Sequence, residues 1–579
     1  MFEAILQELE SDDEGLWCDQ LCIDQLDQAE KKSIIGAMDI IYKSARAVIV
    51  ALDDIEFDEH DTAALREYAD FVTKEVPDGT LPFRHNPSYM KTRPHLQSCL
   101  KKIIYSEYFE RAWCGHELAI GKEHVFLARF HDDGIDVSNK IVRFTGEVLC
   151  TLLELSLFVE LSPDEANERK VLLATLFMRL YQDYKPAELT DDTLRTQIQH
   201  NFMIMMTVIF PMKAGGDPLL PYELRAYDGN NDKVSIVLNG SESGLMLNRT
   251  MHTPDKLLGA TRSVCLQRLM LVALAEGNPL VLCTTGAPLQ LTLNTYSWLN
   301  EFQTSDGNVN EGWSPLPPNW NCHVDPSHLS RYIELDLLIP HIDSIHTASR
   351  VSIDIATKFL SECKDHSISS RSLFESLTAT EQEYWLARVT FATRLLACYL
   401  DLGHAWFECF PRPTGIAQGF LQDPRILSNA IVQLFGEYED RPREKWWGKS
   451  KRHKAAKVLY RAIWSAIERS CPNATLEGFR DWEPGWFEAV DGGRTICFVP
   501  NDRKEYTLAI PDVLRNESYE RLARGWILEK QSSDSGGCER GETWVLRGKS
   551  RIFGTSNFED TGTFTQNTRW KRVWERRFE

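Results

Sequence analysis

The sequence predicts a doubly wound α/β domain at the N-terminus, then a mainly α-helical region, then a β-rich C-terminal segment. Three observations predict this order. Residues 1–130 alternate between strand-like and helix-like apolar patterns, residues 140–410 mostly follow the helical period, and residues 481–579 carry short β-branched and aromatic runs. A chain of 579 residues is several times the usual length of one domain, so more than one folding unit is expected.

Composition and charge exclude several classes of protein. Hydrophobic residues make up 43% of the chain and charged residues 26%, which is typical of globular proteins. There are 64 Lys and Arg against 84 Asp and Glu, a net charge of −20, and residues 1–60 alone hold 16 carboxylates against 4 basic side chains. Specific nucleic-acid binding is therefore not expected, because such proteins normally carry the opposite sign.

The chain is expected to be cytoplasmic. Its 14 cysteines are scattered with no CxxC pair, which favours reduced thiols and argues against a zinc or other metal site. The first residues lack a basic segment followed by an apolar one, so no signal peptide is expected. The longest apolar stretches are too short for a transmembrane segment.

The first predicted elements lie within residues 1–52. Residues 1–14 form a helical pattern, and Gly15 to Cys18 form a short apolar run that fits a buried strand. Asp27 and Glu30 have the spacing of a capping box ahead of an apolar helical stripe that ends near Ala45. Residues 47–52 are continuous and β-branched, as in a parallel strand covered on both faces.

The rest of the first domain continues the alternation. Helices are predicted around residues 65–72, from Pro94 to Ile104 and from about Phe109 to Gly121, followed by a strand over residues 124–128. Since residues 1–14 look helical, the domain is expected to lack its first strand and to be incomplete at its start.

Beyond this domain the sequence predicts three regions. Residues 140–410 are mainly helical with a loop near 304–320, residues 411–480 are helical and basic-aromatic, and residues 481–579 are β-rich. Strands are expected at 495–499 and 506–510, and a hairpin over 544–553 with its turn at Gly548-Lys549.

Two blocks resemble the fungal heterokaryon incompatibility (HET) domain. Residues 15–25 read GLWCDQLCIDQ and are similar to the family's W-I-D-x-L-C-I-N-Q, while residues 108–119 read YFERAWCGHELA and are similar to its W-F-x-R-x-W-x-x-Q-E-L. Cys18, Asp24 and His116 stand where that family usually has Ile, Asn and Gln. The resemblance covers residues 1–130, and the strand with which the family normally opens is missing.

HET domains in turn resemble TIR signalling domains, which implies a flavodoxin-like fold and points to Glu117. The run from Trp113 to Leu118 is similar to the W-C-x-x-E-L of plant TIR domains, in which the glutamate is catalytic for NAD cleavage. Breaking the ribose–nicotinamide bond passes through an oxocarbenium-like state that a carboxylate stabilises. NAD would be a substrate, and no cofactor is expected.

Three further residues complete the candidate site. Trp113 lies one helical turn before Glu117, where it would wall the pocket and raise the pKa of the carboxyl group by desolvation. Asp19 and Asp24 follow a predicted strand and would contact a ribose hydroxyl. The alternatives are structural: Trp113 and Glu117 as a core anchor and its solvent-facing cap, and the two aspartates as Asx turns.

Two functional hypotheses follow. In the first, the chain is a heterokaryon-incompatibility signalling protein that triggers programmed cell death on non-self recognition by NAD-glycohydrolase-like cleavage at Glu117. In the second, the HET domain is degenerate and acts as a non-catalytic scaffold through homotypic association or contact with a HET partner protein. The basic-aromatic stretch from Arg441 to Lys454 either contacts an anionic surface or is a solvated segment.

Overall fold

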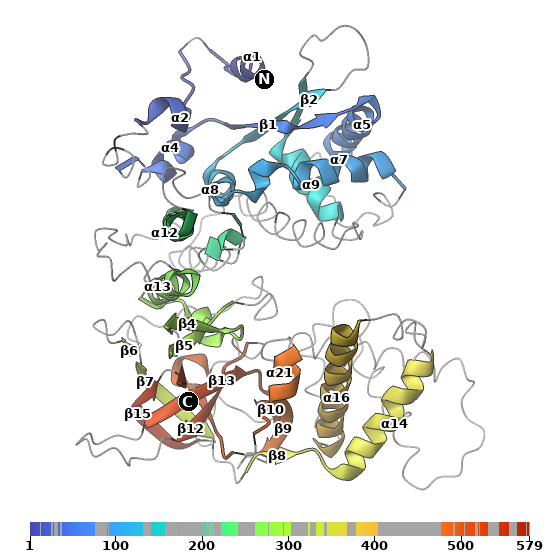
Figure 1. The fold of residues 1–579 in the computed structure, drawn as a ribbon, viewed down its shortest axis with the longest axis vertical. Coiled ribbons are helices and arrows are strands. Elements are labelled where there is room, and N and C mark those ends of the chain that lie inside the picture. Colours follow the sequence, from blue (N-terminus) through green and yellow to red (C-terminus); the bar gives the residue numbers. More distant parts are fainter. Residues whose placement is uncertain are drawn as a thin grey trace. The chain divides into compact units, whose positions relative to one another are not determined.

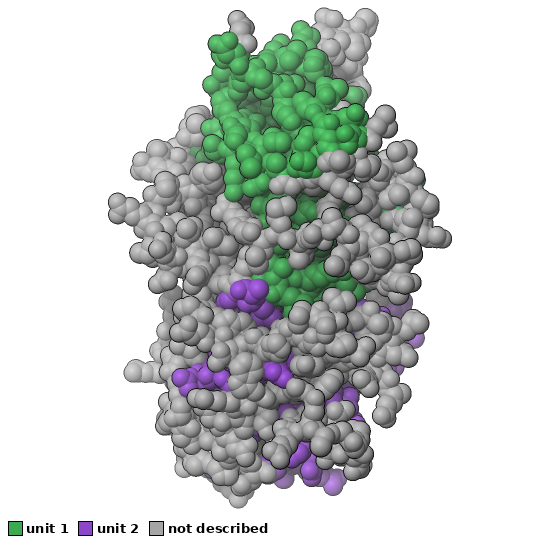
Figure 2. All heavy atoms as spheres, turned by 90° about the vertical axis from the view of Figure 1, so that its left-hand side faces the viewer, with its two compact units in different colours: residues 1–272 green, residues 273–579 purple. Residues whose placement is uncertain are grey.

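The protein was analysed as a computed structural model, and two compact units make up the chain, residues 1–272 and residues 273–579 (Figure 2). The part of the chain that the structure describes, with short gaps inside several ranges, is residues 1–75, 90–130, 141–156, 202–213, 222–240, 261–302, 322–324, 332–340, 344–366, 378–402, 476–530, 543–554 and 564–577. The expected loop at 304–320 and the stretch Arg441–Lys454 lie outside these residues.

The described part of the first unit is a three-stranded sheet with helices (Figure 1). Its strands, in the order β1-β2-β3, are β1 (Val48–Phe57), β2 (His124–Phe130) and β3 (Ile141–Thr145). Its helices are α1 (Phe2–Leu6), α2 (Asp19–Cys22), α4 (Met38–Ser44), α5 (Glu59–Glu75), α7 (Pro94–Ile104), the 3₁₀ helix η1 (Glu107–Glu110), α8 (Ala112–Ile120), α9 (Gly146–Ser156), α12 (Tyr222–Gly240) and α13 (Arg262–Ala275).

The predicted parallel pairing is confirmed. Strands β1 and β2 run parallel with Val48 opposite His124 and Leu52 opposite Ala128, whereas β3 is antiparallel to β2. A parallel pair needs a long crossover, and here α5, α7, η1 and α8 provide it. Helix α5 packs against α7 and against α9, and all three helices contact the sheet. The predicted helix from Pro94 to Ile104 has those bounds in the structure, with Pro94 at its first turn.

The prediction of a strand at Gly15–Cys18 is wrong. These residues belong to no strand, although Cys18 has an extended backbone with φ −136° and ψ 122°. Extended residues become a strand only when a neighbouring strand supplies backbone partners. By contrast, the predicted cap at Asp27 is confirmed, because its Oδ1 accepts the Glu30 N–H at 3.1 Å.

The described strands of the second unit form three sheets (Figure 1). Its elements are the 3₁₀ helix η3 (Pro279–Cys283), β4 (Pro288–Thr292), β5 (Thr295–Asn300), β6 (Cys322–Val324), β7 (Tyr332–Pro340), β8 (His346–Thr347), α14 (Arg350–His366), α16 (Ala379–Leu402), α21 (Leu476–Asp481), β9 (Trp482–Glu488), β10 (Arg494–Pro500), β11 (Thr507–Pro511), η8 (Asp512–Leu514), β12 (Gly525–Lys530), β13 (Thr543–Ser550), β14 (Phe553–Gly554), β15 (Phe564–Trp574) and β16 (Arg576–Arg577).

One strand from the middle of the sequence joins the C-terminal strands. The largest sheet has the order β11-β12-β13-β15-β7-β6, and β7 also pairs with β11, so five of its strands close on themselves. Helices predominate among the described residues between 140 and 410, as expected, but β7 (332–340) forms part of the β-rich region. The helical and β-rich regions therefore share a core.

The strands predicted at 495–499 and 506–510 are confirmed as β10 and β11, which lie in different sheets. The hairpin with a turn at Gly548-Lys549 is wrong, because β13 runs unbroken through these residues. Its partner β12 pairs Ile527 with Gly548 and Leu528 with Leu546, so Arg547 is an extra residue in a β-bulge. A glycine in a strand marks a bulge as well as a turn, and the sequence alone did not distinguish them.

We expect Gly121→Ala to destabilise the first unit. A Cβ atom at Gly121 would lie 2.6 Å from Val48 Cγ2, 2.8 Å from His124 Nε2 and 3.0 Å from the Glu117 carbonyl oxygen. Relieving such a clash typically costs about 1–3 kcal/mol. Differential scanning calorimetry should show a lower Tm for this variant. Gly15→Ala is the control, because nothing lies within 4 Å of a Cβ atom there; equal Tm values for both variants would contradict the prediction.

Candidate functional site

Helix α8 carries the predicted residues Trp113 and Glu117. The preceding helix η1 and hydrogen bonds to Lys213 fix the position at which α8 begins. Arg111 has an extended backbone and precedes the helix directly after η1. The Ala112 N–H donates to the Lys213 carbonyl oxygen at 2.9 Å, and the Lys213 N–H donates to the Glu110 carbonyl oxygen at 2.8 Å. Lys213 also forms an ion pair with Glu110. These bonds anchor the first turn of α8 to a distant segment of the same unit.

The Glu117 side chain points to two tyrosines rather than to open solvent. The Tyr108 hydroxyl group donates a hydrogen bond to Glu117 Oε2 at 2.8 Å, and the Tyr42 side chain also lowers the pKa of the Glu117 carboxyl group. Burial raises the pKa of the Glu117 carboxyl group, and the negative charge of Asp19 adds to this rise. The hydrogen bond from Tyr108 and the positive charge of Arg111 act in the opposite direction.

The two tyrosines remain protonated donors. Burial and the Glu117 charge raise the pKa values of the Tyr108 and Tyr42 hydroxyl groups above the usual range. Neither residue is among the candidates predicted from the sequence. They could have been found because a buried tyrosine usually needs a hydrogen-bond partner for its hydroxyl group, and for Tyr108 this partner is Glu117.

Asp19 acts electrostatically on Glu117, and Asp24 is exposed. Asp19 is the first residue of α2, and its charge raises the pKa values of both Glu117 and Tyr42. Asp24 is exposed and is not among the groups that shift the pKa of Glu117.

Aromatic rings line the same region. Trp113 is half-buried, and its ring meets the His116 ring edge-to-face at 5.7 Å. The Tyr42 ring meets His116 from another side at 5.5 Å and meets the Trp17 ring at 6.1 Å. The contact of Trp113 is therefore with His116, the neighbour of Glu117, whereas the Glu117 carboxylate binds the Tyr108 hydroxyl group.

His116 is fully buried, and neither of its ring nitrogens has a hydrogen-bond partner within the described part of the chain. Burial lowers its pKa to about 3, and the charge of Lys43 contributes. The imidazole is therefore neutral at physiological pH. An unpaired buried polar group typically costs about 1–3 kcal/mol, so this region of the domain is not optimised for stability alone.

A family comparison supports the interpretation of the first unit. Residues 1–117 match the model of the family described as heterokaryon incompatibility protein (HET). Residues 1–117 form a HET domain. The match extends from α1 into α8 and includes Asp19, Trp113 and Glu117. No curated protein and no solved structure matches the chain significantly.

Two further searches concern only the described residues. No helix among them is both long enough and apolar enough to cross a membrane. No group of three or more His, Cys, Asp or Glu side chains among them is placed to hold a metal ion.

The buried histidines should make the HET domain sensitive to acid. Burial also lowers the pKa of His124, to about 4. The unfolded chain, with histidine pKa values near 6.5, then binds more protons than the folded one, so stability falls as pH falls below about 6.5. We expect His116→Gln to show a shallower loss of Tm between pH 6.5 and 4 than wild type. An equal slope would contradict the assignment of a buried neutral His116.

Glu117 should affect the pH dependence of stability in the direction opposite to that of the buried histidines. Its raised pKa means that the folded state holds this proton more tightly than the unfolded state, so its contribution to stability falls as pH rises above about 4.5. We expect Glu117→Gln, which cannot ionise, to have a higher Tm than wild type at pH 7.5, and the difference to shrink towards pH 4.5.

The matched control is Glu67→Gln. Glu67 is an exposed carboxylate that pairs with Arg93 at 3.0 Å, and this substitution should leave the Tm nearly unchanged. A lower Tm for Glu117→Gln than for wild type at pH 7.5 would show that Arg111 and the tyrosines more than offset the desolvation of the charge.

Proposed function

We propose that the HET domain cleaves the ribose–nicotinamide bond of NAD and that this cleavage drives a heterokaryon-incompatibility response ending in cell death. The observation that carries the proposal is the environment of Glu117. Its carboxylate is partly withdrawn from water and accepts a hydrogen bond from the Tyr108 hydroxyl group at 2.8 Å, while Tyr42 lowers and the charge of Asp19 raises its pKa.

The chemistry requires a negative charge at a fixed place. As the bond between ribose C1′ and the pyridine nitrogen breaks, the nitrogen takes the electron pair and nicotinamide leaves neutral. Positive charge develops on the ribose, where the Glu117 carboxylate would stabilise it. Water then attacks C1′ and loses a proton, and a carboxylate with a raised pKa is a suitable acceptor.

The neighbouring residues have distinct proposed roles. Tyr108 holds the Glu117 carboxylate through its hydrogen bond, and Tyr42 lowers the pKa of that carboxyl group. Asp19 would accept a hydrogen bond from a ribose hydroxyl group. This hydroxyl group would then lie between the Asp19 and Glu117 carboxylates. Trp113 would provide an aromatic wall beside the nicotinamide ring. Asp24 is exposed, and we assign it no role in the reaction.

The direct test is nicotinamide release from NAD by the purified full chain. We expect wild type and Glu67→Gln to release nicotinamide at equal rates and Glu117→Gln to lose activity by about 100-fold or more, since the carboxylate acts as both stabiliser and base. Activity should rise with pH through the pKa of Glu117. In Tyr108→Phe this rise should shift to higher pH, because the hydrogen bond that lowers the pKa is lost.

Calorimetry on the same samples confirms that each variant is folded, and light scattering records its assembly state. Equal activity in wild type and Glu117→Gln would overturn the assignment of Glu117. No release from folded, assembled wild type would overturn NAD cleavage and would favour a non-catalytic scaffold that signals by association.

A further inference from the structure

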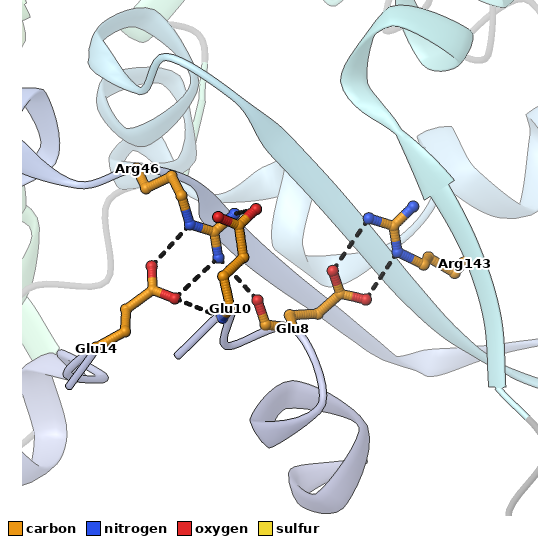
Figure 3. A network of polar contacts seen from close by, with 5 residues as sticks. All are labelled: Glu8, Glu10, Glu14, Arg46 and Arg143. Carbon is orange, nitrogen blue, oxygen red and sulfur yellow. Dashed lines mark hydrogen bonds and ion pairs between the residues drawn. The ribbon is translucent and has the colours of Figure 1, made fainter. Parts of the chain in front are cut away.

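The N-terminal segment is tied to the sheet by two arginines (Figure 3). Arg46 binds Glu14 through both carboxylate oxygens, with Nε to Oε1 at 2.7 Å and Nη2 to Oε2 at 3.2 Å, and Arg46 Nη2 also donates to the Glu8 carbonyl oxygen at 2.7 Å. Arg143 binds the Glu8 carboxylate with Nε to Oε1 at 2.7 Å and Nη2 to Oε2 at 3.0 Å. We call these four residues the N-terminal latch.

The latch joins the segment to two separate elements of the sheet. Arg46 precedes β1, whereas Arg143 lies on β3, and β2 separates these two strands in the sheet. A bidentate arginine–carboxylate pair fixes orientation as well as distance, because two parallel hydrogen bonds resist rotation. Two such pairs at Glu8 and Glu14 therefore define the path of the chain between them.

Apolar packing does little to hold this segment. Helix α1 has no buried residue; of its three large apolar side chains, Phe2 and Leu6 are 61% and 43% exposed and Ile5 is half-buried. The Glu8 and Glu14 side chains, by contrast, are only 17% and 25% exposed. The attachment of residues 1–14 is thus mainly ionic and should weaken as salt screens the charges.

The segment leads directly into the candidate site. Trp17, three residues after Glu14, places its ring against the Tyr42 ring with 6.1 Å between the centroids, and two residues further on the charge of Asp19 raises the pKa of Glu117. Five residues span at most about 17 Å when fully extended, so the position of Glu14 limits where Asp19 can lie. Two of the acidic side chains in residues 1–14, Glu8 and Glu14, therefore form specific ion pairs with Arg143 and Arg46.

We propose that Arg46 and Arg143 are positioning residues that hold Glu8 and Glu14 so that Trp17 and Asp19 stay at the Tyr42–Glu117 pair. Neither arginine touches a reacting group. The catalytic consequence rests on the proposed NAD cleavage, whereas the structural part can be tested without it.

The structural test is hydrogen exchange of the full chain, measured by mass spectrometry at low salt. We expect the double variant Arg46→Gln/Arg143→Gln to exchange at least 10-fold faster in peptides covering residues 1–14 and also in those covering residues 15–24. In wild type, 1 M NaCl should have the same effect. Arg93→Gln, which removes a surface ion pair with Glu67, should behave like wild type.

Reversal of one pair tests the ionic nature of the latch. Arg46→Glu alone should lose protection, and adding Glu14→Arg should restore it in both peptide regions. Faster exchange confined to residues 1–14 would overturn the proposal, because the latch would then stabilise residues 1–14 without positioning Trp17 and Asp19. Unchanged exchange in the double variant, or no rescue by the reversed pair, would overturn it as well.

Nicotinamide release separates this proposal from the proposed function. If wild type cleaves NAD, the latch variants should show a raised KM or a lowered kcat that the reversed pair restores, and unchanged constants would overturn the positioning role. If wild type does not cleave NAD, the proposed function fails, while the exchange data still decide whether the latch positions Trp17 and Asp19.

Discussion

The hydrogen bond from Tyr108 to Glu117 is the interaction on which the candidate site depends. It can form only because α8 starts at a fixed point after η1 and packs closely against its neighbours. Gly115 shows how close this packing is, since a Cβ atom there would lie 2.3 Å from Ile209 Cδ1. Glu117 thus reaches its tyrosines because small residues let α8 approach the rest of the unit, and the carboxylate is desolvated as a consequence.

Desolvation of the site lowers the stability of the folded domain and strengthens the electrostatic effect of the groups in it. A carboxyl group with a raised pKa and an unpaired neutral His116 both reduce the stability of the folded domain at some pH, and they do so in opposite pH ranges. Proteins retain such groups at sites where a fixed charge is needed, because a preorganised charge in a poorly hydrated place acts more strongly than one in water. These two groups are the observations on which the candidate site in the HET domain rests.

Long-range contacts organise both units. In the first unit, Arg46 and Arg143 bring residues 8–14 back to the sheet. In the second, the buried Trp526 donates its Nε1–H to the Leu282 carbonyl oxygen at 3.0 Å, more than 200 residues earlier in the chain. Contacts of this kind fix where an extended or helical segment lies, and local sequence preferences do not encode them.

The sequence by itself determined several of the local elements and made Glu117 the candidate for the site. The proline at Pro94, the cap at Asp27 and the β-branched run at 47–52 act through nearby backbone, so their predictions held. Tertiary structure alone decided that Gly15–Cys18 lack a strand partner, that Gly548 lies at a bulge, and that Tyr42, Tyr108 and Asp19 all act on Glu117. These outcomes depend on which distant segment supplies a hydrogen bond, and no local pattern contains that information.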